Sequence, residues 1–195
     1  MVQINLPSQN KPADSLMKYF KLFVAFVLSV IITVAILSFF MSTSQQVEKS
    51  VTINAPAAIV FEQLVKLENF NKWSVWNRQD STVQHTISGI DGTVGAINTW
   101  TGHPEISGEG KMEITAIEKD KKVTHIINFI KPRENIAKSA FVLKETEAGT
   151  IVTWQFKLAT PRPWNIFNLF YSMDKKMGKD FEDGLLLLKR IIEKK

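Results

Sequence analysis

The chain has 195 residues, 45% of them hydrophobic, and no cysteine, which excludes disulfides, thiolate metal sites and a cysteine nucleophile. Its formal net charge of +5 falls by two, to +3, when the three lysines and one aspartate before residue 22 are set aside. The remaining basic residues are scattered among acidic ones rather than gathered in a stripe, so we expect no nucleic-acid partner.

The N-terminal part is predicted to anchor the chain in a membrane. Residues 1–18 have little periodicity and are expected to form a loosely ordered tail, and residues 19–41 are predicted to be a transmembrane helix. Leu22–Met41 carries no charge, and at about 1.5 Å per residue it spans roughly 30 Å, one hydrocarbon thickness. A buried core helix or a cleaved signal peptide is the alternative, but a signal peptide has a shorter apolar region of about 7–15 residues.

The lysines predict the orientation of this single-pass span. Lys11, Lys18 and Lys21 precede the span, whereas Lys49 alone follows shortly after it. Positive residues favour the cytoplasmic side, so we expect a cytoplasmic N-terminus and an extracytoplasmic C-terminal domain. Residues 42–46, STSQQ, are predicted to be a polar linker to a domain over residues 47–195.

The first part of the domain is predicted to be a strand followed by a helix. Val47–Asn54 has the composition of a strand, and Pro56 suits the first turn of a helix. In that helix, the apolar residues share one buried face. A shorter helical or looped piece carries Trp73 and Trp76.

A change of hydrophobic period from 3.6 to 2 predicts strands from about Val83 to Leu158. Within this region, Ala148-Gly149 is a hairpin signal between Ala137–Lys144 and Ile151–Leu158. Because the turns are short, neighbouring strands are expected to be antiparallel.

The C-terminal part is predicted to be one long helix from about Trp164 to Glu193. Its apolar residues step by three or four and so share one face: Ile166, Phe170, Met173, Met177, Phe181, Leu185, Leu188 and Ile192. Such a face must cover something apolar, and the sheet is the available partner. The pattern therefore predicts an α+β domain in which one long helix covers a sheet.

Several short motifs follow one another in the domain: Val51–Phe61, Trp73–Trp76, Gly95–Trp100, Gly108–Met112, Gly149–Trp154 and Met173–Phe181. Together they resemble the polyketide cyclase/dehydrase and lipid-transport proteins of the START-related SRPBCC superfamily, over about residues 47–193. This resemblance implies a helix-grip fold, in which a curved antiparallel sheet of six or seven strands wraps around the C-terminal helix and two short helices follow the first strand. It also implies a cavity for lipids, polyketides or other hydrophobic molecules.

Aromatic and sulfur-bearing side chains are the candidates for lining such a pocket. The candidate set is Trp100, Phe141, Trp154 and Phe156 on the sheet, facing Phe170, Met173, Met177, Phe181 and Gly184 on the helix. Ordinary core packing requires the same residues and is the competing interpretation. A glycine costs about 1 kcal/mol in a helix interior, so Gly184 implies either close helix–sheet contact or room for a guest.

The polar residues give a weaker indication of chemistry. The three histidines show no metal-ligand spacing, and we expect neither a metal nor a cofactor. His103 with Glu105 and Glu109 would suit acid/base catalysis at a cavity mouth, although a polar loop tip explains them equally well.

The sequence thus predicts a membrane-anchored module that binds a hydrophobic small molecule or lipid, with no catalytic residues. Two alternatives stay open: a polyketide cyclase-like enzyme with acid/base groups at the cavity mouth, and a membrane-localised interaction protein whose core is filled.

Overall fold

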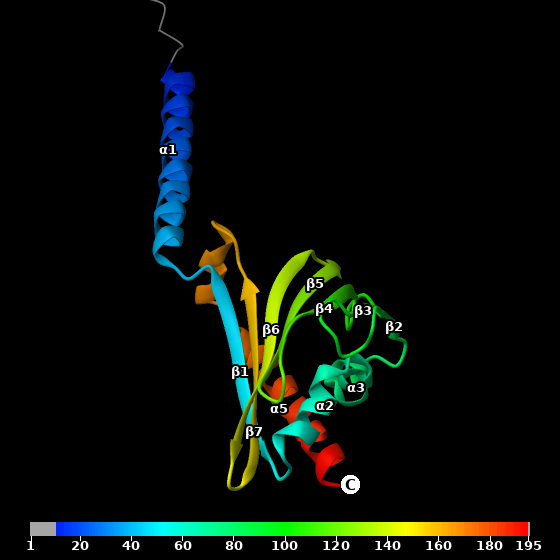
Figure 1. Ribbon diagram of the computed structural model, residues 1–195. Helices are drawn as coiled ribbons and strands as arrows, with labels where there is room; N and C mark the ends of the chain where they lie inside the picture. The colour runs from blue at the N-terminus through cyan, green and yellow to red at the C-terminus, as the bar shows by residue number, and fades with distance from the viewer. Residues whose placement is uncertain (1–10, 195) are drawn as a thin grey trace, which may run out of the picture.

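A 30-residue helix, α1 (Lys11–Phe40), leads into the rest of the protein in the computed structural model, which describes residues 11–194 (Figure 1). The most apolar 18-residue window within Ser15–Phe40 has a mean hydropathy of 2.9, and almost all side chains of Ser15–Phe40 are exposed. The helix is therefore long and apolar enough to cross a membrane. Thr33 Oγ1 donates to the Ser29 carbonyl at 2.8 Å, so this hydroxyl is satisfied within the helix.

The helix begins upstream of the expected boundary at residue 19. Residues 11–18, expected to belong to a loosely ordered tail, are helical. The remainder of the predicted tail, residues 1–10, lies outside the described residues.

Seven antiparallel strands form one sheet in the order β1-β7-β6-β5-β4-β3-β2. The strands are β1 (Ser44–Ile53), β2 (Gln84–Ser88), β3 (Ile97–Thr101), β4 (Glu109–Glu118), β5 (Lys122–Lys131), β6 (Asn135–Thr146) and β7 (Gly149–Ala159). β1 begins at Ser44, inside the segment expected to be a linker. The backbone of Ser44, Gln45 and Gln46 pairs with the end of β7, and this pairing outweighs their polar composition.

The strand register brings several chain segments to the same end of the sheet. Ser44 is opposite Ala159, Leu158 is opposite Ala137, and Phe129 is opposite Asn135. The end of α1, the end of β7 and the β5–β6 turn therefore lie at this end of the sheet. Figure 1 shows these segments at the same end of the sheet.

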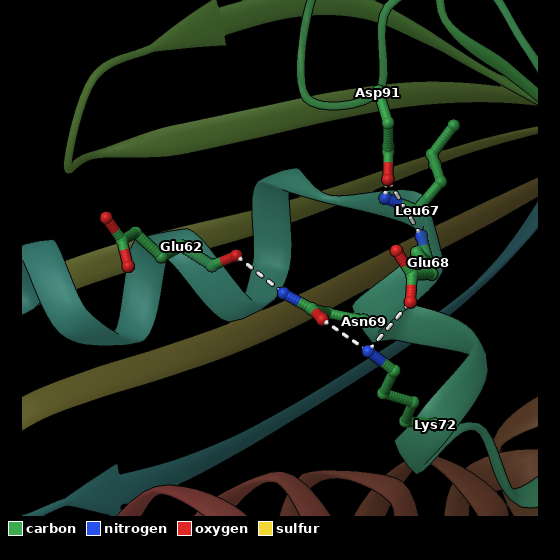
Figure 2. A network of polar contacts seen from close by, with 6 residues as sticks. All are labelled: Glu62, Leu67, Glu68, Asn69, Lys72 and Asp91. Atoms are coloured by element: carbon green, nitrogen blue, oxygen red, sulfur yellow. Dashed lines mark hydrogen bonds and ion pairs between the residues drawn. The ribbon is translucent and has the colours of Figure 1, made fainter.

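Three short helices follow β1, where two were expected: α2 (Ala57–Val65), α3 (Leu67–Trp73) and α4 (Val75–Gln79). α3 and α4 are separate because Ser74 has an extended backbone. The Asp91 carboxylate accepts hydrogen bonds from the backbone N–H groups of Leu67 at 2.7 Å and Glu68 at 3.1 Å (Figure 2). These bonds satisfy free donors at the start of α3 and attach the β2–β3 loop to it.

The C-terminal helix is interrupted, contrary to the expectation of one helix from Trp164. Trp164–Leu169 is a 3-10 helix, η1, and α5 runs from Met173 to Glu193. The Ser172 side chain accepts a hydrogen bond from the Lys175 N–H at 3.3 Å. Ser172 is thus the N-cap at which α5 begins, and the apolar pattern before it belongs to a separate element.

α5 lies across the sheet and buries Phe181, Leu185 and Leu188. A Cβ on Gly184 would approach a ring atom of Trp154 to 3.2 Å and a methyl of Val75 to 3.4 Å. The glycine therefore permits close contact between the helix and the core. The seven-stranded antiparallel sheet with a long C-terminal helix confirms the predicted helix-grip architecture.

Candidate ligand cavity

A cavity of about 600 Å³ lies between the sheet, the short helices and the start of α5. Its deep wall is formed by the buried side chains of Met112, Phe141, Trp154 and Phe156. Trp154 and Phe141 are held against each other with ring centroids 5.1 Å apart. The volume is within the range of roughly 300–1,000 Å³ that small-molecule sites occupy.

The cavity mouth is marked by exposed lining residues from three segments. They are residues 104–106 of the β3–β4 loop, Lys131 at the end of β5 with residues 132–133 of the β5–β6 turn, and Tyr171 before α5. The β5–β6 turn lies at the end of the sheet that α1 joins. The β3–β4 loop lies at the same end, because it connects Thr101 to Glu109, which are paired with each other. The mouth is therefore at the α1 end of the domain.

A buried carboxylate fixes the β3–β4 loop. Asp80 accepts hydrogen bonds from the Thr82 hydroxyl at 2.6 Å and from the His103 N–H at 2.7 Å. These hydrogen bonds hold the pKa of the Asp80 carboxyl well below its usual range, and the bond from the Thr82 hydroxyl has the largest effect. A Cβ on Gly102 would collide with the same carboxylate, so only glycine allows the loop to pass this closely.

A row of polar side chains interrupts the apolar wall. His85 Nδ1 is 3.2 Å from Asn98 Oδ1, and Asn98 Nδ2 donates to Asn71 Oδ1 at 3.0 Å. Asn77 Nδ2 in turn donates to the Asn71 carbonyl at 2.8 Å. His85, Asn98 and Asn77 line the cavity, so the row presents fixed polar atoms to its interior.

The geometry of His85 defines which atom it offers to a ligand. Burial lowers the pKa of the imidazole, which favours the neutral ring. With Asn98 Oδ1 as acceptor, Nδ1 carries the hydrogen and Nε2 carries a lone pair. Nε2 is buried and has no hydrogen-bond partner among residues 11–194. His85 can therefore accept a hydrogen bond from a bound molecule.

His125 is buried on β5 against the Phe141 ring, with centroids 5.7 Å apart, and does not line the cavity. Burial lowers its pKa to about 4. Its Nδ1 has no hydrogen-bond partner within the described part of the chain. The side chain is therefore a neutral part of the core.

We expect His125 to make the folded state sensitive to acid. The unfolded chain takes up a proton near the ordinary pKa of about 6.5, whereas folded His125 does so only near pH 4. The free energy of unfolding should therefore fall as the pH drops between these values, by roughly 3 kcal/mol in total. Urea denaturation at pH 7 and pH 4.5 measures this loss, and His125→Leu should show a smaller loss than the wild type. An equal loss in both proteins would contradict the assignment.

The structure brings together five of the nine predicted pocket residues. Trp100, Phe141, Trp154, Phe156 and Met177 all line the cavity. Three others, Met173, Phe181 and Gly184, are buried in the contact between α5 and the core and do not line it. Phe170 is 86% exposed on the turn before α5 and lies outside the cavity.

The predicted acid/base group is only partly assembled. Glu105 lines the mouth, and its N–H donates to His103 Nδ1 at 3.3 Å. Glu109 instead pairs with Lys131, with Oε1 and Nζ 2.9 Å apart. Among the residues that the structure describes, no three His, Asp or Glu side chains gather as a metal site requires.

Sequence reasoning missed the polar groups of the cavity. His85 and Asn98 are 13 residues apart in the chain and meet because β2 pairs with β3. The available signal was the alternation of β2, which places His85 on the same face as Ile87. Ser139, which accepts a hydrogen bond from Trp154 Nε1 at 3.0 Å, also lines the cavity and gave no sequence signal.

The fold and the cavity define a helix-grip protein with a mainly apolar pocket that opens at the α1 end of the domain. The family model described as polyketide cyclase / dehydrase and lipid transport matches residues 44–193, and the chain belongs to this family. Proteins of this group generally bind hydrophobic ligands. No match to the chain was found among curated proteins.

Solved structures from several sources share the fold. A protein of Chromobacterium violaceum is 10% identical with a TM-score of 0.55, and the alignment covers 76% of this chain and 98% of that one. Major latex-like protein 151 of Panax ginseng is 16% identical with a TM-score of 0.53, over 78% of this chain and 97% of that one. The Aha1 dimer of Colwellia psychrerythraea is 18% identical with a TM-score of 0.50, over 76% and 96%. At such low identity, these similarities describe the fold alone.

Proposed function

We propose that the protein is a membrane-anchored module that binds a hydrophobic small molecule or lipid without catalysis. The observation that carries this proposal is the cavity of about 600 Å³, whose deep wall is aromatic and sulfur-bearing. Transferring an apolar ligand from water into such a cavity is favourable by about 25 cal/mol for each Å² of apolar surface that is buried. A completely filled core, as an interaction protein would have, does not account for this volume.

The polar row suggests that the ligand has one hydrogen-bond donor on an otherwise apolar body. The free lone pair of His85 Nε2 costs energy while it stays buried and unpaired. A hydroxyl or a protonated carboxyl group of the ligand would satisfy it. This single polar contact would orient the ligand, while the aromatic wall provides most of the affinity.

The anchor is the second part of the proposal. α1 would cross the bilayer within residues 19–41, with the N-terminus in the cytoplasm and the domain of residues 47–195 outside it. Its length, its apolar exposed surface and the preceding lysines support this arrangement.

A titration of residues 42–195 with a fatty acid that carries an environment-sensitive fluorophore tests the binding function. The family match begins at residue 44, so this fragment contains the whole matched domain. We expect saturable one-to-one binding with a blue-shifted emission, and competition by the unlabelled fatty acid. His85→Leu should weaken binding of a hydroxylated ligand by about tenfold, because the ligand hydroxyl would lose its hydrogen-bond acceptor. Emission that rises without saturation would contradict a defined site.

An enzyme of the polyketide cyclase type is the second candidate. It is favoured by the same neutral His85, since an imidazole with a free Nε2 inside a cavity is suited to general-base catalysis. Glu105 and His103 at the mouth are the other available groups. If any turnover is detected, a combined replacement of His103 and Glu105, and separately His85→Leu, would identify the base.

A further inference from the structure

Large aromatic side chains are exposed on the short stretch between β7 and α5. We call residues 164–171 the aromatic segment, which consists of η1 and the two residues after it. Its exposed members are Trp164 at 61%, Phe167 at 57%, Leu169 at 63%, Phe170 at 86% and Tyr171 at 40%. A cluster of this kind at one site on a soluble surface is unfavourable, and it indicates that something apolar or interfacial covers it.

Hydrogen bonds fix the aromatic segment beside the end of α1. Asn165, which is fully buried, donates from Nδ2 to the Ser38 carbonyl at 2.7 Å and to the Met41 carbonyl at 3.1 Å. Arg162 donates from Nε to the Ser38 carbonyl and from Nη2 to the Phe39 carbonyl, both at 3.2 Å. The Ser38 and Phe39 carbonyls belong to the last turn of α1 and lack partners within the helix itself, and Met41 directly follows the helix. Figure 1 shows the segment, in orange, next to the lower end of α1.

We propose that the aromatic segment lies in the interfacial layer of a phospholipid bilayer, at the level where α1 leaves the membrane. Trp and Tyr prefer this layer because their rings are apolar with one polar atom. The hydrogen bonds to Ser38, Phe39 and Met41 hold the segment at the depth of the last turn of α1. This inference rests on the proposed membrane span, but not on the identity of a cavity ligand.

Basic residues beside the segment match the charge of anionic lipid headgroups. The Arg162 guanidinium lies 5.0 Å from the Phe39 ring centroid, and Lys176 Nζ lies 4.9 Å from that of Tyr171. Arg133 is exposed at the neighbouring β5–β6 turn. Basic residues close to an anionic surface are attracted to it.

This placement sets the cavity mouth against the bilayer. Tyr171 belongs both to the aromatic segment and to the mouth, and the β5–β6 turn lies at the same end of the sheet. A lipid-like molecule would then pass between the bilayer and the cavity without crossing bulk water.

Single-cysteine labelling of the full chain tests the inference, because the natural chain has no cysteine. An environment-sensitive fluorophore is attached in Phe167→Cys and in Phe170→Cys. The matched control is Glu147→Cys, an exposed position on the β6–β7 turn at the opposite end of the sheet. Each variant is reconstituted into phosphatidylcholine and phosphatidylglycerol vesicles that contain lipids spin-labelled near the headgroup.

We expect the probes at positions 167 and 170 to shift to shorter wavelength and to lose roughly half or more of their emission to the quencher, whereas the probe at 147 keeps its emission. Quenching at 167 and 170 no greater than at 147 would overturn the inference. A fourth variant, Val30→Cys, with lipids labelled deep in the acyl chain, tests α1 separately. If position 30 is not quenched, the span itself fails, and the docking surface fails with it.

Discussion

Leu158→Trp should weaken binding of the fluorescent fatty acid by at least about tenfold while the domain stays folded. Leu158 is half-buried on β7 and lines the cavity. An indole at this position would extend into space that a ligand must occupy. Because the side chain has room in the cavity, the substitution removes ligand volume without forcing core residues apart, which would otherwise destabilise the fold.

Leu186→Trp is the matched control for this variant, since it makes the same change at an exposed position on α5. It should bind the fatty acid like the wild type. The titration described for residues 42–195 measures all three proteins, and circular dichroism shows that each is folded. Unchanged affinity in a folded Leu158→Trp protein would mean that the ligand binds elsewhere.

Phe181→Ala should lower the free energy of unfolding by about 3–5 kcal/mol. The Phe181 ring is fully buried, with its centroid 4.3 Å from that of Trp154 and 5.6 Å from those of Trp76 and Phe156. The truncation therefore removes apolar contacts from both the sheet and α4 and leaves a void behind. Urea denaturation followed by far-UV circular dichroism measures the change.

The control for this truncation is Leu186→Ala on the exposed face of α5, for which we expect a loss below about 1 kcal/mol. Comparable small losses in both variants would indicate that α5 is not docked on the sheet. Such a result would contradict the helix-grip packing, and with it the cavity that the start of α5 helps to line.

The architecture was predictable because its signals are periodic. The alternation along β4 and β7 and the face of α5 that holds Leu185 and Leu188 each report which side is buried. The break before α5 was not predictable from this signal, since Phe170 continues the apolar spacing across it. What ends the pattern is one serine hydroxyl, Ser172, which periodicity does not register.

The cavity was predictable only in part, because an apolar side chain looks the same in a packed core and in a pocket wall. Met177 lines the cavity while Phe181, one turn along the same helical face, is packed against the sheet. Both residues continue the same apolar spacing, so the sequence pattern does not distinguish them. The polar row from His85 to Asn98 depends on β2 pairing with β3, a register that the sequence alone does not specify.

Native mass spectrometry of residues 42–195, purified without detergent and followed by organic extraction, tests most directly whether the cavity between the sheet, the short helices and the start of α5 binds a ligand. We predict a complex with one apolar molecule per chain, recovered in the extract and missing from the Leu158→Trp protein. A protein that carries no guest after purification, and acquires none when incubated with fatty acids or phospholipids, would contradict the account.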